Sequence, residues 1–357
     1  MMDAHRYKTW AIAFLAVFAG LLLLLGGATA VIDPYFHYHK PLDGLSYPIS
    51  IERYQNNGIV KNFDYDAIIT GTSMTQNFKT SEFDQIFGVN SVKVPLSGAG
   101  WMEVGDNLAV AASHNSRLRT VLWGLDHNNL LLPYDWSPYE HDFYPWYLYD
   151  DNPLNDVSYL LNKTVLLGAT KNVLTYTRAG RTTTSFDTYG NWMDRVTFGK
   201  EAILENYSRD SKADTQTTFS EEDKQTVKTR VERIVLSQAE QNPNIDYYCF
   251  FTPYSILYFD YLDQVGELEL CLDAEKYAIE LMLPYNNIHL FSFFTEYDMI
   301  CNLSNYKDVF HYHEDVNSQM LQWMHDGVGE LTKDNYEDYC AEMREFYLNY
   351  DYDALFT

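Results

Sequence analysis

Basic residues are scarce in this chain, and their scarcity argues against several classes of partner. The 357 residues include 25 Lys and Arg against 50 Asp and Glu, which gives a formal charge of −25 at pH 7. An acidic surface repels a phosphate backbone, and no basic stripe in the sequence offsets that repulsion. We therefore expect no nucleic-acid binding. The same charge disfavours docking on anionic lipid through charge alone.

Cysteine is also scarce, and the chain shows no internal repeat. All cysteines lie in the last third of the sequence, at Cys249, Cys271, Cys301 and Cys340. Their spacing is unlike that of a zinc site. Outside the cytoplasm they would permit disulfides in several pairings, but a buried free thiol is an equal alternative for Cys249, which lies in an apolar run. Without repeats, the length indicates one large domain or two modest ones.

The clearest positive signal is an uncharged apolar run at the N-terminus, residues 10–32. As a helix rising about 1.5 Å per residue, this run is long enough to span a bilayer. Arg6 and Lys8 precede it, so the positive-inside rule predicts a cytoplasmic N-terminus at residues 1–9 and a single-pass protein whose bulk lies outside the cytoplasm. A cleaved signal peptide is the alternative, because residues 28–30 (Ala-Thr-Ala) fit a cleavage site, but the length of the run favours an uncleaved anchor.

Short apolar runs alternate with helical segments over most of the remaining chain. The runs have the length and composition of buried parallel strands. We predict strands at residues 67–70, 91–96, 120–125, 247–252 and 288–293. We predict helices at residues 80–87, 101–114, 274–283 and 314–325. This alternation predicts an α/β fold with a doubly wound, mostly parallel sheet.

The same pattern gives a plan of domains beyond the anchor. Residues 33–60 contain several X-Pro pairs and are expected to form a juxtamembrane stalk. Residues 61–330 would form the α/β domain, with an insertion at residues 130–245 between its third and fourth strands. Near the end of this insertion, Ser220 and a carboxylate three residues later indicate a capped helix. Residues 331–357 are expected to form an acidic helical tail.

Two motifs place a nucleophile and an acid–base pair where an α/β fold carries its chemistry. Gly71-Thr72-Ser73 follows the first strand, and Gly permits a sharp turn that exposes the Ser hydroxyl at the sheet edge. Asp308 lies three residues before His311, so its carboxylate can orient one imidazole nitrogen while the other takes the Ser73 proton. Each motif alone is a weak signal. Together they predict Ser73, Asp308 and His311 as the catalytic residues.

The C-terminal motif also allows a metal-site interpretation. His313 lies two residues after His311, and in extended chain both side chains share one side. Asp308 or Asp315 would complete such a ligand set. No further imidazole or thiolate lies at ligand spacing, so we expect neither a metal nor a cofactor.

Taken together, the motifs resemble those of the SGNH (GDSL-like) hydrolase superfamily. In that family a Ser follows the first strand, a Gly the second and a Gly-x-Asn motif the third, and an Asp-x-x-His lies near the end. The agreement covers residues 66–325 outside the insertion, and it implies a flavodoxin-like sheet with the amides of Ser73 and Gly98 in an oxyanion hole. Asp126 stands where the family has Asn, and an ionised Asp cannot donate to an oxyanion. Either Asn128 donates from a shifted turn, or only the backbone amides donate, or Asp126 has another role.

The N-terminal anchor narrows the resemblance to cell-surface SGNH proteins. These include the DltD-like proteins of teichoic acid D-alanylation and the AlgX/AlgJ-like proteins of polysaccharide acetylation, whose His-containing stretch resembles residues 311–317. The resemblance implies an extracytoplasmic serine esterase or O-acyltransferase acting on acyl esters of a cell-envelope polysaccharide or teichoic-acid-type polymer. The expected partners are that polymer, the membrane and a membrane-bound O-acyltransferase.

Three other classes of function stay open at this point. The Asp126 substitution would suit an inactive SGNH scaffold that binds an envelope polymer or a membrane acyltransferase. The His311 segment would suit a metal-dependent phosphodiesterase, and the anchor would suit a structural protein of an envelope complex. Aromatic side chains of the insertion could stack on sugar rings, although ordinary packing is the more common role. The residues concerned are Trp136, Tyr144, Trp146 and Tyr147.

Overall fold

The computed structural model describes every residue except 1–3, 140–143, 151, 210 and 357. The chain divides into two compact units. We call Met1–Phe63 with His141–Ser185 the anchor unit, and Asp64–Glu140 with Phe186–Thr357 the sheet unit. The predicted insertion at residues 130–245 is therefore divided between the two units rather than forming one body.

The sheet unit is built on a six-stranded mixed sheet with the order β2-β1-β3-β4-β5-β6. Its strands are β1 (Ala67–Thr70), β2 (Ser91–Lys93), β3 (Thr120–Leu125), β4 (Asp246–Phe251), β5 (Ile288–Phe291) and β6 (Glu330–Leu331). Strands β1 to β5 pair in parallel and β6 pairs antiparallel with β5. The residues of β1 are buried throughout, as expected for a central strand covered on both faces.

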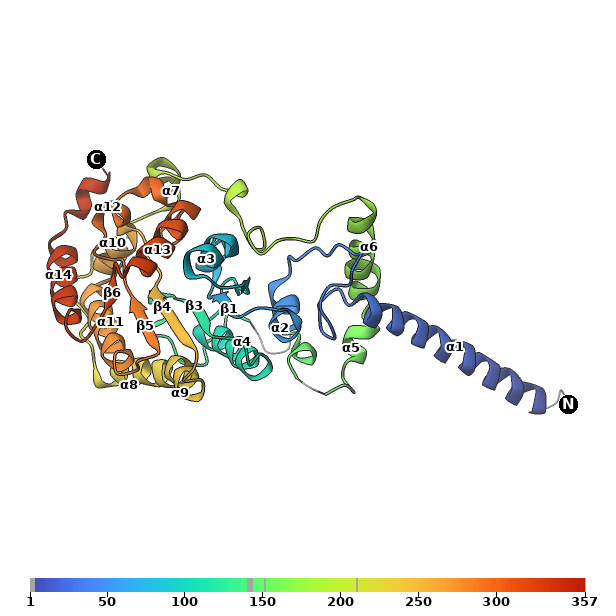
Figure 1. Cartoon of the computed structure of the whole chain (residues 1–357). Coiled ribbons are helices and arrows are strands. Elements are labelled where there is room, and N and C mark those ends of the chain that lie inside the picture. The colour runs from blue at the N-terminus through green and yellow to red at the C-terminus, as the bar shows by residue number, and fades with distance from the viewer. Residues whose placement is uncertain (1–3, 140–143, 151, 210, 357) are drawn as a thin grey trace. The chain divides into compact units, whose positions relative to one another are not determined.

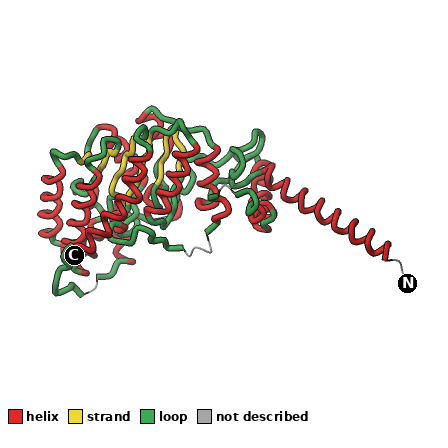
Figure 2. The backbone as a smooth tube through the Cα atoms, turned by 90° about the horizontal axis from the view of Figure 1, so that it is seen from below, coloured by secondary structure: helices red, strands yellow, loops and turns green. Residues whose placement is uncertain are grey.

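Helices cover both faces of this sheet (Figures 1 and 2). One layer contains α3 (Thr80–Phe87), which packs against α13 (Glu314–Asp326). In the other layer α11 (Leu268–Met282) contacts its neighbours on both sides. That layer includes α4 (Trp101–His114), α8 (Glu221–Arg230), α9 (Ser237–Gln241), α10 (Ile256–Val265) and α14 (Tyr336–Asn349). Shorter helices are α7 (Lys200–Asn206) and α12 (Tyr297–Ile300). The prediction of an α/β fold with a mostly parallel sheet is confirmed.

Local signals located most elements correctly, and the departures have simple causes. Strand β2 ends at Lys93 rather than at residue 96, although the amides of Val94 and Leu96 still donate to the carbonyls of Ile69 and Gly71. Strand β6 has only two residues, too few for a periodic signal. Helix α8 begins with the predicted cap, in which the Ser220 hydroxyl accepts from the Asp223 amide. The C-terminal segment is helical as predicted, but α14 packs against α11 instead of extending as a tail.

The anchor unit begins with α1 (Ala4–Ile32). Within the described residues, this is the one helix long and apolar enough to cross a membrane. The unit continues through α2 (Glu52–Asn62), α5 (Val157–Leu160), a π-helical turn (Val165–Ala169) and α6 (Thr170–Arg178). Helix α1 packs against α5, the π-helical turn and α6.

The prediction of a stalk at residues 33–60 was wrong. These residues contain α2 and fold together with residues 141–185. Asp33 links these segments, because its fully buried carboxylate accepts from the amides of Tyr38 (2.7 Å) and His39 (2.9 Å) and from the Tyr159 hydroxyl (2.7 Å). The X-Pro pairs correctly argued against a long helix, but they carry no information about a partner 126 residues away.

Candidate active site

The turn after β1 is shaped by Gly71 and presents Ser73 at the carboxyl end of a central strand. Gly71 has φ +145°, and a Cβ at this position would lie 2.7 Å from Thr75 Cγ2. A side chain therefore does not fit there. Ser73 follows as the first residue of a 3₁₀ turn (Ser73–Thr75), which the Thr72 side chain caps by accepting from the Met74 amide. In parallel α/β sheets this edge is where ligands bind.

The structure brings Ser73, His311 and Asp308 into one hydrogen-bonded row. The Ser73 hydroxyl lies 2.8 Å from His311 Nε2, although the two residues are 238 positions apart in the chain. His311 Nδ1 lies 2.9 and 3.0 Å from the two carboxylate oxygens of Asp308. Asp308 Oδ1 also accepts from the amide of His311 (2.7 Å), which fixes the carboxylate beside the ring. This geometry leaves Nε2 as the nitrogen that can accept the Ser73 proton.

The surroundings of Asp308 favour its ionised form. Burial raises the pKa of Asp308, but hydrogen bonds to His311, the charge of His311 and Lys307 outweigh burial and hold that pKa well below its usual value. Lys307 Nζ lies 2.7 Å from Asp308 Oδ2 and 5.0 Å from the centre of the Trp192 ring. Trp192 in turn presents its ring edge-on to His311, with centroids 5.5 Å apart. Lys307 thus contacts the carboxylate, and Trp192 packs against the imidazole.

Two backbone amides at the site are free to face a developing oxyanion. Gly98 follows β2 in the left-handed region, with φ +68°, and lines the same cleft as Ser73. No described residue accepts a hydrogen bond from the amide of Ser73 or of Gly98. Free amides converging near a nucleophile are the usual elements of an oxyanion hole.

Asp126 and Asn128 are joined through one tyrosine. The Tyr254 hydroxyl lies 3.1 Å from Asp126 Oδ1 and 3.0 Å from Asn128 Oδ1. Asp126 is 5% exposed and also accepts from the Thr252 hydroxyl at 3.2 Å. Burial raises the pKa of Asp126, while hydrogen bonds from Thr72, Tyr254 and Thr252 and the charge of His311 oppose that rise.

The number of protons shared by Asp126, Tyr254 and Asn128 limits how their hydrogen bonds can be arranged. A phenol carries one proton, so Tyr254 donates to either Asp126 or Asn128, not to both. If Asp126 is protonated and donates to Tyr254, then Tyr254 donates to the Asn128 carbonyl and the Asn128 NH₂ faces the cleft. If Asp126 is ionised, Tyr254 donates to it. The Asn128 side chain then forms a hydrogen bond by turning its NH₂ toward the Tyr254 oxygen. Only the first arrangement offers the cleft a donor.

The cleft over Ser73 has a volume of about 150 Å³ and opens beside an apolar cavity of about 390 Å³. Asn128 and Phe310 line both spaces. The walls of the larger cavity are mainly apolar, and include Leu130, Leu131, Leu132, Tyr258 and Leu262. A small polar cleft with a nucleophile and an adjoining apolar cavity suits an acyl ester, with its carbonyl in the first and its chain in the second.

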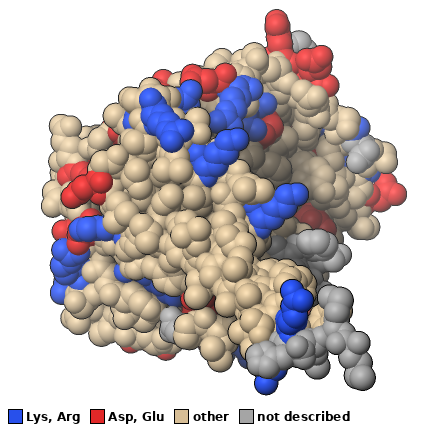
Figure 3. Space-filling model, turned by 90° about the vertical axis from the view of Figure 1, so that its right-hand side faces the viewer, with Lys and Arg blue, Asp and Glu red and all other residues tan. Residues whose placement is uncertain are grey.

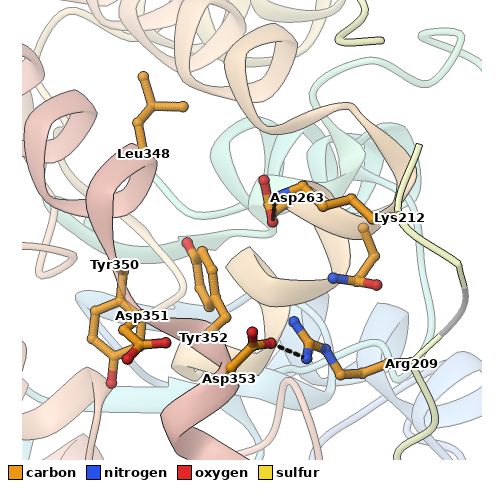
Figure 4. A pocket seen from close by; sticks show the side chains of 9 residues that line it. Arg209, Lys212, Asp263, Leu348, Tyr350, Asp351, Tyr352 and Asp353 are labelled. Carbon is orange, nitrogen blue, oxygen red and sulfur yellow. Dashed lines mark hydrogen bonds and ion pairs between the residues drawn. The ribbon is translucent and has the colours of Figure 1, made fainter. Parts of the chain in front are cut away.

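A third cavity, of about 440 Å³, lies near the C-terminus of the chain (Figure 4). Its charged groups bind each other. Arg209 contacts Asp353 at 2.6 Å and Asp260 at 2.9 Å, and Lys212 contacts Asp263 at 2.6 Å. The described residues that line this cavity include no Ser, Thr, Cys or His, so its larger volume does not make it the reactive site.

Several predicted site residues lie elsewhere than expected. Of the aromatic residues considered for stacking on sugar rings, Trp136 lines the Ser73 cleft, whereas Tyr144, Trp146 and Tyr147 belong to the anchor unit. His313 caps α13 by accepting from the Asp315 amide at 3.2 Å, and no group of metal-binding side chains is found among the described residues. All four cysteines are free thiols.

Comparisons with known proteins add little to this geometry. The chain matches no protein-family model and no curated protein. Among solved structures it is similar to one described as a proposed platelet activating factor from Streptococcus pneumonia. That match covers 81% of this chain and 90% of the other, at 11% identity and a TM-score of 0.36. A similarity this low carries no argument about function.

Proposed function

We propose that this protein is a membrane-anchored serine esterase or O-acyltransferase of the SGNH type. The observation that carries the proposal is the Ser73–His311–Asp308 row, with contacts of 2.8 and 2.9 Å. The strand order supports it, because 2-1-3-4-5 is the order of flavodoxin-like doubly wound sheets. The position of Ser73 directly after β1 and of Gly98 after β2 agrees with the SGNH motif order.

The proposed reaction proceeds through an acyl-enzyme. Ser73 Oγ attacks the ester carbonyl carbon while its proton passes to His311 Nε2. The resulting oxyanion is stabilised by the amides of Ser73 and Gly98, and by Asn128 when its NH₂ faces the cleft. His311 then protonates the departing alcohol as the C–O bond breaks. In the second half His311 deprotonates water or an acceptor hydroxyl, which attacks the acyl carbon. His311 then returns this proton to Ser73 Oγ as the bond between Oγ and the acyl carbon breaks.

The expected placement of the site supports the substrate class that we propose. An anchor preceded by Arg6 and Lys8 would place the sheet unit outside the cytoplasm, beside envelope polymers. We infer that the substrate is an acyl ester of a cell-envelope polysaccharide or teichoic-acid-type polymer. A membrane-bound O-acyltransferase is the partner that would supply acyl groups in the transferase form of the reaction.

A fluorophosphonate probe tests the proposed nucleophile. The full-length protein in detergent is expected to be labelled, because the probe reacts with activated serines, and Ser73→Ala is expected to abolish labelling. A Ser137→Ala control, which removes an exposed Ser of the same unit, should label like wild type. If a folded wild-type protein stays unlabelled, the inactive-scaffold hypothesis replaces the enzyme hypothesis.

Filling the apolar cavity tests the proposed acyl-binding role. Leu131→Trp places a bulky ring among its walls, and we expect turnover of an octanoyl ester to fall about 10- to 100-fold relative to an acetyl ester, because pocket contacts of a few methylenes are of this size. Chain-length series of p-nitrophenyl esters measure this ratio. Val328→Trp, at an exposed position, is the control. Equal losses on both esters would show that the chain does not enter this cavity.

A further inference from the structure

The anchor unit exposes large apolar side chains outside its transmembrane helix. Leu154 is 86% exposed, Val157 54% and Leu167 66%, and Leu174 is exposed as well. All of them belong to residues 152–181, which contain α5, the π-helical turn and α6. Scattered single apolar residues are normal on a protein surface, but several within one short segment mark a contact surface.

The segment packs beside the part of α1 that lies within the apolar run. A Cβ at Gly26 would lie 3.5 Å from Leu161 Cδ2 and 3.7 Å from Leu160 Cβ. Gly26 precedes Ile32, the end of α1, by six residues, which corresponds to about 9 Å along the helix axis. On α1 itself Leu23 and Leu24 are among the most exposed apolar residues. If lipid surrounds this end of α1, the same lipid surrounds the segment packed beside it.

The charge of this segment departs from that of the whole chain. Residues 152–181 carry four exposed basic side chains: Lys163, Lys171, Arg178 and Arg181. The one acidic residue among them, Asp156, is buried and bound by His37 Nε2 at 3.2 Å and by the Tyr38 hydroxyl at 2.9 Å. Figure 3 looks at the molecule from the right-hand side of Figure 1, and on this face both basic and acidic groups lie among largely uncharged atoms. Exposed basic and apolar groups together suit the headgroup region of an anionic bilayer.

We propose that residues 152–181 lie in the headgroup–acyl boundary of the leaflet in which α1 ends. Leu154, Val157, Leu167 and Leu174 reach the acyl chains, and the basic side chains contact anionic headgroups. The expectation from net charge that anionic lipid is avoided thus fails locally, because the acidic residues lie elsewhere in the chain. This proposal rests on α1 spanning the membrane and not on the proposed catalysis.

The test measures the depth of a fluorescent label in nanodiscs containing phosphatidylglycerol. The full chain carries an NBD group on Leu167→Cys, in a background where the partly exposed Cys301 and Cys340 are Ser. The label is expected to be quenched by doxyl groups on lipid tails and protected from iodide in water. A label on Leu348→Cys, exposed in the sheet unit, should show the reverse. Equal iodide quenching at both positions would overturn the proposal.

Changing the charge of the segment or of the lipid tests whether lipid, rather than a protein partner, covers this surface. In Lys163→Glu/Lys171→Glu, and for the unaltered segment in pure phosphatidylcholine, quenching by doxyl lipid should fall severalfold. Quenching that is unchanged in both cases would overturn the headgroup contact. Protection of Leu167 in native membranes but not in nanodiscs would also overturn it, because a protein partner would then cover the segment. Thermal melts followed by circular dichroism establish that each variant is folded. Fluorophosphonate labelling of the same variants is measured separately, because the membrane contact does not depend on the proposed catalysis.

Discussion

Replacing Asp308 with Asn is expected to lower kcat for ester turnover by roughly 10⁴-fold, the size of effect seen when a serine protease loses the same carboxylate. The Asn amide would donate to His311 Nδ1, and the ring proton would then sit on Nε2. A protonated Nε2 cannot accept the Ser73 proton across their 2.8 Å contact. Steady-state kinetics on an acetyl ester, with fluorophosphonate labelling rates beside them, measure the loss.

The control for this variant is Asp298→Asn, which changes the same carboxylate to the same amide at an exposed position of the sheet unit. It should leave kcat within about twofold, as expected for a surface substitution away from the site. Thermal unfolding of both variants checks the fold. If Asp308→Asn keeps kcat within tenfold of wild type while remaining folded, Asp308 does not orient His311 and the proposed triad fails.

The parts of this site that the sequence revealed are those encoded by local spacing. A strand followed by Gly71 fixes where Ser73 lies, because the strand end and the turn are determined by neighbouring residues. The three-residue spacing of Asp308 and His311 likewise allows a carboxylate to reach the adjacent ring. The contact between the two motifs could be inferred only because parallel strands bring their carboxyl ends to one edge.

The parts that the sequence did not reveal depend on distant partners with no local signature. Tyr254 lies 128 positions from Asp126, and nothing around either residue indicates that they meet. Lys307 adjoins Asp308 in the sequence, yet its contact with Trp192 arises from a loop in another part of the chain. The fold of the anchor unit could not be predicted for the same reason, since the Asp33–Tyr159 bond joins segments that are separated in the sequence by residues 64–140 of the sheet unit.

Replacing Asp126 with Asn is expected to change the pH dependence of the reaction rather than abolish it. In wild type the Asn128 NH₂ faces the cleft only while Asp126 keeps its proton. Activity should therefore show a falling limb as pH passes the raised pKa of Asp126. An Asn at 126 always offers an NH₂ to Tyr254, so this limb should disappear. At higher pH the variant should exceed wild type by up to roughly 10²-fold, the value of one oxyanion donor.

The two buried tyrosines near Asp126 cannot produce this limb. Burial raises the pKa of Tyr254 and of Tyr312 well above 10, so both keep their protons throughout the range. Removing the donor itself gives the matched comparison, because Asn128→Ala should lower kcat with little change in KM and should also lose the falling limb. Asn128→Ala activity equal to wild type at every pH would show that the backbone amides alone form the hole.

The pH dependence of stability gives an independent measure of the protonation of Asp126. Burial, the largest influence, raises the pKa of Asp126 in the folded state, so the folded protein binds this proton more tightly than the unfolded chain does. The contribution of Asp126 to stability is therefore fully present below the ordinary Asp value of 3.8 and declines as pH rises from there toward the raised pKa. Asp126→Asn carries no such charge, so its unfolding free energy relative to wild type should increase across that window and then level off. Urea unfolding at a series of pH values measures the difference. A difference independent of pH would mean that folding does not raise the pKa of Asp126, so that Asp126 is ionised above its ordinary value of 3.8, with the Asn128 NH₂ turned toward Tyr254 and away from the cleft.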